Sequence, residues 1–443
     1  MIVHPIDYRY GTPQMKRIWS EESKIKRMIR VEMAILKALA NKGYLDISAV
    51  NKAKKQSLNI STDRVKEIEA EIKHDIMALV RAISEVSGEA SRWVHFGATS
   101  NDITDTATAT QLRDSLKLME SRIKKLLVLL SQKAEEYRDV VCLGRTHGQP
   151  ALPTTYGFRF AIWASEMGRH YIRLQQLRDR LLVGIFSGAV GTQAALGEEG
   201  IELEEDVMRI LGLKPAMVSS QIIPRDIYCE YIEFLSNVAT TLEKIATNFR
   251  ILQRAEVGEI SEKFEEKQVG SSTMPHKRNP IDSENICGLA RVIRGFVEPQ
   301  HQSAILWEER DLSNSSAERI TLLEPTVLTD HILSKMTKVV ESMSLDMDNI
   351  KRNMDMHKGL NLSEAVMVAL TRRGMGRQEA HELVREASLR TKTSLYDELA
   401  KSEEITRYIS SDELKEILKP QNYLGTAGKR VDRTIEWVDH LLR

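Results

Sequence analysis

Residues 235–252, LSNVATTLEKIATNFRIL, have the apolar pattern of a long helix and indicate the fold class. The apolar positions are separated alternately by three and four residues: Leu235, Val238, Leu242, Ile245, Phe249 and Leu252. This spacing places their side chains on one face of an α-helix, as in a helix packed along the seam of a bundle. The stretch therefore predicts a long, buried helix.

Two further segments carry the same apolar pattern. One runs from Leu112 to Leu130, and a less regular one runs from Phe160 to Leu181. Three such stripes predict an all-α protein with one extended helical bundle, in which the stripes form core or subunit interface and carry no chemistry. The composition agrees, because Gly (23) and Pro (11) are sparse and no Asn-Gly or Asp-Gly dipeptide signals a β-hairpin.

The chain has 443 residues, which is too long for one ordinary core. We expect three helical domains: an N-terminal domain over residues 1–91, a central long-helix bundle over 92–349 and a smaller C-terminal domain over 350–443. Residues 186–224 are richer in Gly, Ser and Pro, and this composition predicts a loop-rich interruption of the bundle.

Charge and cysteine content exclude several classes of protein. Lys plus Arg equals Asp plus Glu at 63 each, so no global basic field favours nucleic acid and any anion site must be local. Cys142, Cys229 and Cys287 are isolated, which argues against a disulfide framework or a zinc site. Neither a signal peptide nor a membrane span is evident in the sequence, so we expect a soluble, cytoplasmic protein without membrane partners.

The loop GSSTMPHKRNP, residues 270–280, is the most informative stretch for function. Gly270 gives the backbone the freedom to bring the amides of Ser271 and Ser272 close to a bound group. Pro275 and Pro280 lack amide hydrogens, so the segment between them is predicted to be neither helix nor central strand.

A helix start follows the loop. Asn279 is predicted to be its N-cap, with Pro280 at the first helical position and Asp282 in the first turn. The helix N-terminus favours an anion, and Lys277 adds a positive charge beside it. The loop therefore predicts a site that stabilises a carbanion.

Four other blocks accompany this loop: RYGTPQM (9–15), HFGATSND (95–102), RTHGQPALPTTYG (145–157) and WEERDLSNSSAER (307–319). In residues, order and spacing, the five blocks resemble the fumarase/aspartase superfamily and, within it, the adenylosuccinate lyase family. The resemblance covers essentially the whole chain. A mild departure from the family pattern is Tyr156, where phenylalanine is common.

The resemblance implies an activity and an assembly. Members of the family eliminate fumarate in anti fashion from adenylosuccinate to give AMP, and from succinylaminoimidazole carboxamide ribotide to give aminoimidazole carboxamide ribotide, in purine biosynthesis. They need no metal or organic cofactor. They are homotetramers in which the central bundles form the core and each active site combines blocks from three subunits.

The resemblance also implies the catalytic residues. Ser271 is expected to be the base, although the sequence does not decide between it and Ser272, and His147 is expected to be the general acid. Lys277 would stabilise the carbanion, and Glu284 would raise the basicity of His147. A lone histidine is more often structural, so the neighbours of His147 in its block carry this assignment.

The residues expected to bind substrate come from several blocks. They are Arg9, Tyr10, Lys73, His74, Asp75, Thr99, Ser100, Gln221, Ser272, Asn279, Asn285, Arg310, Ser315 and Arg319. The resemblance assigns the first two to the nucleotide phosphate. It assigns Thr99 and Ser100 to a substrate carboxylate. From the residues alone, helix capping would equally explain Ser100 and Asp102, and most of the others would be solvated surface.

Two other functions remain open from the sequence. The nearer is another lyase or a cycloisomerase of the superfamily, against which Arg9, Tyr10 and Arg319 argue. The other is a non-catalytic structural protein on the same scaffold, which the intact Ser271 and His147 disfavour.

Overall fold

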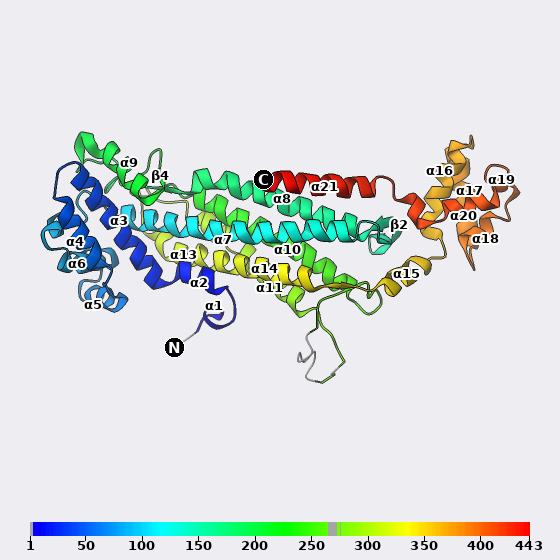
Figure 1. Ribbon diagram of the computed structural model, residues 1–443, viewed down its shortest axis with the longest axis horizontal. Helices are drawn as coiled ribbons and strands as arrows, with labels where there is room; N and C mark the ends of the chain where they lie inside the picture. The colour runs from blue at the N-terminus through cyan, green and yellow to red at the C-terminus, as the bar shows by residue number, and fades with distance from the viewer. Residues whose placement is uncertain (1–2, 265–272, 275) are drawn as a thin grey trace. The chain divides into compact units, whose positions relative to one another are not determined.

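The computed structural model describes residues 3–264, 273–274 and 276–443 (Figure 1). Helices make up most of the described chain and the strands are short, which confirms the predicted all-α class. The chain forms two compact units, each built from three segments. Unit 1 comprises Met1–Ile123, His170–Leu242 and Gly288–Ser334, and unit 2 comprises Lys124–Arg169, Glu243–Cys287 and Lys335–Arg443. The division into domains at residues 91 and 349 stays a prediction.

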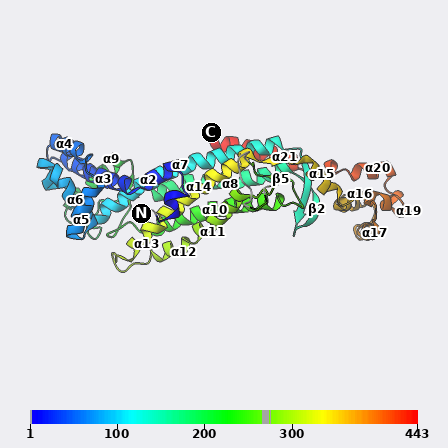
Figure 2. The same ribbon diagram turned by 90° about the horizontal axis from the view of Figure 1, so that it is seen from below.

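The N-terminal segment of unit 1 is a cluster of short and medium helices. They are α1 (Pro5–Tyr8), α2 (Pro13–Trp19), α3 (Glu21–Asn41), α4 (Ile47–Ser57), α5 (Thr62–Ile72), α6 (Asp75–Val86) and η1 (Gly88–Trp93). Side-chain caps set several of the starts; Ser20, for example, accepts a hydrogen bond from the Ser23 amide at the start of α3. Helices α3 to α6 lie together around a core that includes Leu36, Leu79 and Ile83 (Figure 2).

Five long or medium helices contribute residues to both units. They are α7 (Ser100–Glu136), α8 (Tyr156–Leu181), α10 (Asp226–Leu252), α11 (Ile281–Arg294) and α14 (Leu323–Ser342). All three predicted stripes lie on these helices and are buried within the single chain, from Leu112 on α7 to Leu252 on α10. The interpretation of the stripes as core is therefore confirmed. None of the helices in the described ranges combines the length and apolar character of a membrane span.

The prediction for residues 186–224 is wrong in part, because the segment contains a helix. After β3 (Val183–Gly184) come η2 (Gly197–Glu199), α9 (Gly200–Leu211) and β4 (Lys214–Pro215), which pairs in parallel with β3. Helix α9 packs on α3 and buries Leu203, Val207 and Met208. It ends at Gly212, whose φ of +69° is the left-handed conformation that glycine supplies at helix ends. The glycines that suggested a loop flank this helix.

The rest of unit 1 consists of α12 (Val297–Gln302) and α13 (Ser313–Thr321). Unit 2 contains the pairs β1 (Val141–Thr146) with β2 (Gln149–Thr155), and β5 (Ile260–Ser261) with β6 (Ser344–Leu345), both antiparallel. Its C-terminal elements are α15 (Met347–Asp355), η3 (Leu360–Leu362), α16 (Ser363–Arg372), α17 (Arg377–Arg390), α18 (Leu395–Leu399), α19 (Glu403–Thr406), α20 (Ser411–Ile417), η4 (Pro420–Tyr423) and α21 (Ala427–Leu442). Helices α16 to α20 share a core that includes Leu370, Leu395 and Leu414.

The β1–β2 hairpin shows why a missing Asn-Gly signal did not exclude a hairpin. Thr146 pairs with Gln149, so the loop between the strands is His147–Gly148. Both loop residues have positive φ, +55° and +73°, as a two-residue hairpin turn of the type I′ family requires. Histidine tolerates the left-handed region better than most residues, and here it takes the place of the more usual asparagine.

Candidate active site

Unit 1 contains a cleft of about 740 Å³, within the usual size range of small-molecule sites. The lining comes from helices α2, α3, α5, α6, α7, α10, α13 and α14 and from the adjoining loops. The lining includes nine of the residues that the sequence predicted to bind substrate: Lys73, His74, Asp75, Thr99, Ser100, Gln221, Arg310, Ser315 and Arg319. Residues that lie as far apart in sequence as 73 and 319 thus meet at one cavity.

One wall of the cleft is the sharp turn between α5 and α6. Lys73 ends α5 with a φ of +59°. His74 caps α6, because its Nδ1 accepts a hydrogen bond of 3.3 Å from the Met77 amide. The neutral tautomer that this bond requires carries its proton on Nε2. The next residue, Asp75, accepts a hydrogen bond of 3.2 Å from Nη2 of Arg319, so α6 and α13 are joined at this wall.

At the start of α7, helix capping and lining of the cleft are performed by different residues. Asp102 accepts a hydrogen bond of 2.8 Å from the Thr99 amide and further bonds from the Ser187 and Gly188 amides at 2.9 and 3.0 Å. Burial raises the pKa of Asp102, although these amides oppose the shift. Asp102 therefore has the structural role. The Ser100 hydroxyl makes no hydrogen bond to any other described residue and lines the cleft.

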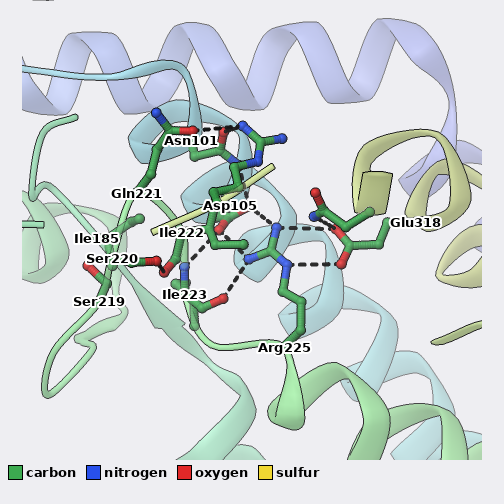
Figure 3. A network of polar contacts seen from close by, with 12 residues as sticks. Asn101, Asp105, Ile185, Ser219, Ser220, Gln221, Ile222, Ile223, Arg225 and Glu318 are labelled. Carbon is green, nitrogen blue, oxygen red and sulfur yellow. Dashed lines mark hydrogen bonds and ion pairs between the residues drawn. The ribbon is translucent and has the colours of Figure 1, made fainter. Parts of the chain in front are cut away.

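A buried ionic network forms the floor of the cleft (Figure 3). The Arg225 guanidinium donates five hydrogen bonds: two to Asp105 (2.6 and 2.9 Å), two to Glu318 (2.9 and 3.2 Å) and one to the Ile223 carbonyl oxygen (2.7 Å). The side chain of Arg225 is only 2% exposed. Burial would lower the pKa of Arg225, but the adjacent carboxylates raise it. Burial raises the pKa of Glu318 against the opposing effect of Arg225.

Arg310 extends this network towards the substrate-binding residues. Its Nη1 donates to Asn101 Oδ1 at 2.7 Å and to Gln221 Oε1 at 3.1 Å. Its Nε is buried and has no hydrogen-bond partner among the residues that the structure describes. Burial lowers the pKa of Arg310. Because an unpaired, buried N–H is costly, an anionic ligand oxygen at Nε would offset this cost.

The site residues predicted from the sequence do not include Asp105, Arg225 and Glu318. A signal for the first was present, because Asp105 lies seven residues before Leu112, on the same face of α7 as the apolar stripe. A carboxylate on a buried face requires a cationic or hydrogen-bonding partner. The identity of that partner was not visible, since Arg225 is 120 residues further along the chain.

In unit 2 the predicted acid, His147, is exposed at the tip of the β1–β2 hairpin. The hairpin is tied through Arg145 to Glu259, which has no exposed side-chain surface. Glu259 accepts hydrogen bonds from Arg145 (2.5 Å), Tyr156 (2.6 Å) and Asn353 (2.8 Å). Burial would raise the pKa of Glu259, but these donors together lower it. The hydroxyl of Tyr156, the mild departure from the family pattern, is therefore used.

The helix predicted after the loop of residues 270–280 is present but begins one residue later than expected. Helix α11 starts at Ile281, so the expectation that Pro280 is the first helical residue is wrong. The Ile281 amide instead bonds back to the carbonyl oxygen of Asn279 at 2.9 Å. Residues 276–279 are neither helix nor strand, as predicted. Ser271 and Ser272 lie outside the described residues.

The N-terminus of α11 does bind an anion, but one that belongs to this chain. The amides of Asp282 and Ser283 donate to the two carboxylate oxygens of Glu262 at 3.2 and 2.8 Å. These two amides are therefore occupied by Glu262 in the structure described. Lys277 and Glu284 are exposed.

The remaining predicted residues lie apart from the cleft lining. In unit 1, Arg9 is exposed, and the ring of Tyr10 packs against His331 with ring centres 5.6 Å apart. In unit 2, Asn279 and Asn285 are half-buried. The buried Oδ1 of Asn285 has no hydrogen-bond partner among the described residues.

Comparisons with known proteins agree with this arrangement. Residues 7–295 match the family model described as lyase, and residues 359–434 match the one described as adenylosuccinate lyase C-terminus. The chain is 71% identical to the adenylosuccinate lyase of Archaeoglobus fulgidus, with all of both chains covered. It is 47% identical to that of Methanocaldococcus jannaschii, covering 98% of this chain and 96% of the other.

A solved structure shares the fold. The 3-carboxy-cis,cis-muconate lactonizing enzyme of Pseudomonas putida superposes with a TM-score of 0.90 at 32% sequence identity, covering 99% of both chains.

Proposed function

Because the chain belongs to the adenylosuccinate lyase family of the fumarase/aspartase superfamily, we propose that it eliminates fumarate from adenylosuccinate to leave AMP. The second reaction of the family, on succinylaminoimidazole carboxamide ribotide, is part of the same proposal. The structural observation that supports it most directly is the cleft of unit 1, which gathers nine predicted substrate-binding residues. The enzyme is a carbon–nitrogen lyase.

The cleft suits an anionic, polar substrate. Arg310 presents a buried N–H without a partner among the described residues, and Arg319 is held in place by Asp75. Thr99 and Ser100 are proposed to hold a carboxylate of the succinyl group, since Asp102 performs the capping that could otherwise have explained them. Arg9 and Tyr10 are proposed to contact the phosphate.

Elimination requires loss of a proton from the carbon next to one carboxylate and loss of the nitrogen from the adjacent carbon. We assign proton removal to Ser271. Lys277 then stabilises the negative charge that develops in the carboxylate, where it is greater in the transition state than in the substrate. His147 protonates the departing nitrogen. Glu284 is proposed to raise the basicity of His147.

The proposed assembly is a homotetramer whose active sites combine residues of three subunits. The exposure of His147 at the tip of an anchored hairpin supports this, because the tip is accessible to another chain. We further propose that the enzyme works in the cytoplasm, where its three unpaired, buried cysteines would stay reduced.

The similarity to the muconate lactonizing enzyme is compatible with the alternative function of a cycloisomerase. At 32% identity, however, this similarity supports the shared fold rather than a shared substrate. The 71% identity over the full chain favours the lyase.

The test is the ultraviolet absorbance change when the purified protein meets adenylosuccinate. We expect the wild type to form AMP and fumarate, Ser271→Ala and His147→Ala to be inactive, and argininosuccinate to be left unchanged. Failure of a folded wild-type tetramer to convert adenylosuccinate would contradict the proposal.

A further inference from the structure

Lys24 lines the cleft, yet neither its sequence context nor its family resemblance assigned it a role. It lies in the first turns of α3 and is half-buried. Its ammonium group makes no ion pair or hydrogen bond with any residue that the structure describes. The residues electrostatically coupled to it include Arg319 and Asp75, which form the ion pair between α13 and α6. Lys24 therefore belongs to the same end of the cleft as Arg319.

The charges that line this cleft do not balance. On the floor, the two positive charges of Arg225 and Arg310 equal in number the negative charges of Asp105 and Glu318, and Arg225 is bonded to both carboxylates.

The remaining charged lining residues are three cations, Lys24, Lys73 and Arg319, and two carboxylates, Glu69 and Asp75. Asp75 is bound to Arg319, and no carboxylate of the described residues lies within ion-pair distance of Lys24. This end of the cleft carries an excess of positive charge that an anionic ligand would neutralise.

Burial and a neighbouring cation both act against the charged form of Lys24. Burial, and then the nearby positive charge of Arg319, lower the pKa of Lys24, whereas Asp75 and Glu21 act in the opposite direction. A partly desolvated cation beside a second cation is destabilised until an anion lies between them. A dianion relieves this repulsion more than a single carboxylate does.

We propose that Lys24 is a substrate-binding residue whose ammonium group contacts the 5′-phosphate of the nucleotide, together with Arg319 and in addition to the contacts proposed for Arg9 and Tyr10. This inference rests on the proposed function. The phosphate is favoured over a substrate carboxylate because it carries the greater charge. In addition, the hydroxyl of Ser100, at the start of α7, makes no hydrogen bond to another described residue and is proposed to hold the carboxylate instead. An ammonium group suits this role as a compact charge with three donors.

The experiment measures equilibrium binding of AMP, adenosine and fumarate by calorimetry to the wild type and three variants. Lys24→Met removes the charge and keeps most of the aliphatic stem, and Lys24→Arg keeps the charge. Lys26→Met is the matched control, since Lys26 lies on the same helix but is exposed and ion-paired with Glu22. Thermal unfolding of each variant verifies that it is folded.

We expect Lys24→Met to weaken AMP binding about tenfold, as for loss of a partly exposed, charge-assisted hydrogen bond. Its affinity for adenosine, which lacks the phosphate, should be unchanged. The affinity of Lys24→Arg for AMP should stay close to that of the wild type, and the affinity of Lys26→Met for AMP should equal it. Unchanged AMP binding by Lys24→Met would overturn the proposal, as would an equal loss for AMP and adenosine.

A selective loss for fumarate would overturn the phosphate assignment and indicate a carboxylate contact. These results are distinct from failure of the proposed function. In that case the wild type itself would not convert adenylosuccinate, whatever its affinity for AMP.

Discussion

Replacing Arg225 by methionine should destabilise the protein more than the loss of any comparable surface arginine. The change removes five hydrogen bonds. It leaves the carboxylates of Asp105 and Glu318, whose side chains are only 5% and 10% exposed, without their cationic partner. Removing one partner of a buried ion pair costs about 3–5 kcal/mol, because the remaining charge is left uncompensated. Methionine fills most of the volume of the arginine stem, so we expect a loss of about 4 kcal/mol in the free energy of unfolding.

The matched control is Arg180→Met. Arg180 also forms a two-pronged pair with a carboxylate, that of Glu230, but its side chain is 54% exposed. A pair in that environment contributes about 0–1 kcal/mol. Urea unfolding, followed by circular dichroism at one fixed protein concentration, compares both variants with the wild type.

The pH dependence gives a second readout of the same variant. Burial already raises the pKa of Glu318, and loss of Arg225 removes an interaction that opposes this rise. The destabilisation of Arg225→Met arises from the ionised carboxylate of Glu318. It is therefore fully present above the pKa of Glu318 in the folded variant and becomes smaller as the pH falls through that pKa. The deficit of Arg225→Met should therefore be smaller at pH 5 than at pH 8. A loss of stability in Arg225→Met no larger than that in Arg180→Met, or a loss that grows as the pH falls, would contradict this prediction.

Two further predictions concern unit 2. Glu259→Gln should lower the free energy of unfolding at pH 7 by about 3 kcal/mol, because Arg145 loses its buried counter-charge. Since the pKa of Glu259 is lowered in the folded protein, its stabilisation is present above the ordinary glutamate pKa and is lost as the pH falls through the folded value. The difference from the wild type in urea unfolding should thus narrow at acid pH, and equal stability at pH 7 would contradict this. Lys277→Met should lower kcat roughly 10²–10³-fold in initial-rate assays, as for removal of a group that stabilises transition-state charge, and an unchanged kcat would remove Lys277 from the mechanism.

The helices that the sequence predicted best are those whose signal is local. The stripe from Leu235 to Leu252 repeats with the period of one helix, so no knowledge of distant residues was needed to place it inside. The hairpin at His147 was missed because its turn uses a histidine, and α9 was missed because its flanking glycines suggested a loop. In both cases the local conformation depends on tertiary packing that composition does not describe.

The helical class and the order of the chemical blocks could be predicted from the sequence, and the resemblance of those blocks indicated the family. Which charged side chains meet could be seen only in the folded chain. A buried carboxylate such as Asp105 requires a partner, but the chain can supply one from any distance, and here Arg225 and Glu318 supply it. The same holds for Lys24, which by sequence is an ordinary helical lysine. It becomes a candidate substrate-binding residue only because it lines the cleft without an ion-pair partner among the described residues. Periodicity is a property of neighbouring residues, whereas charge compensation is a property of the folded chain.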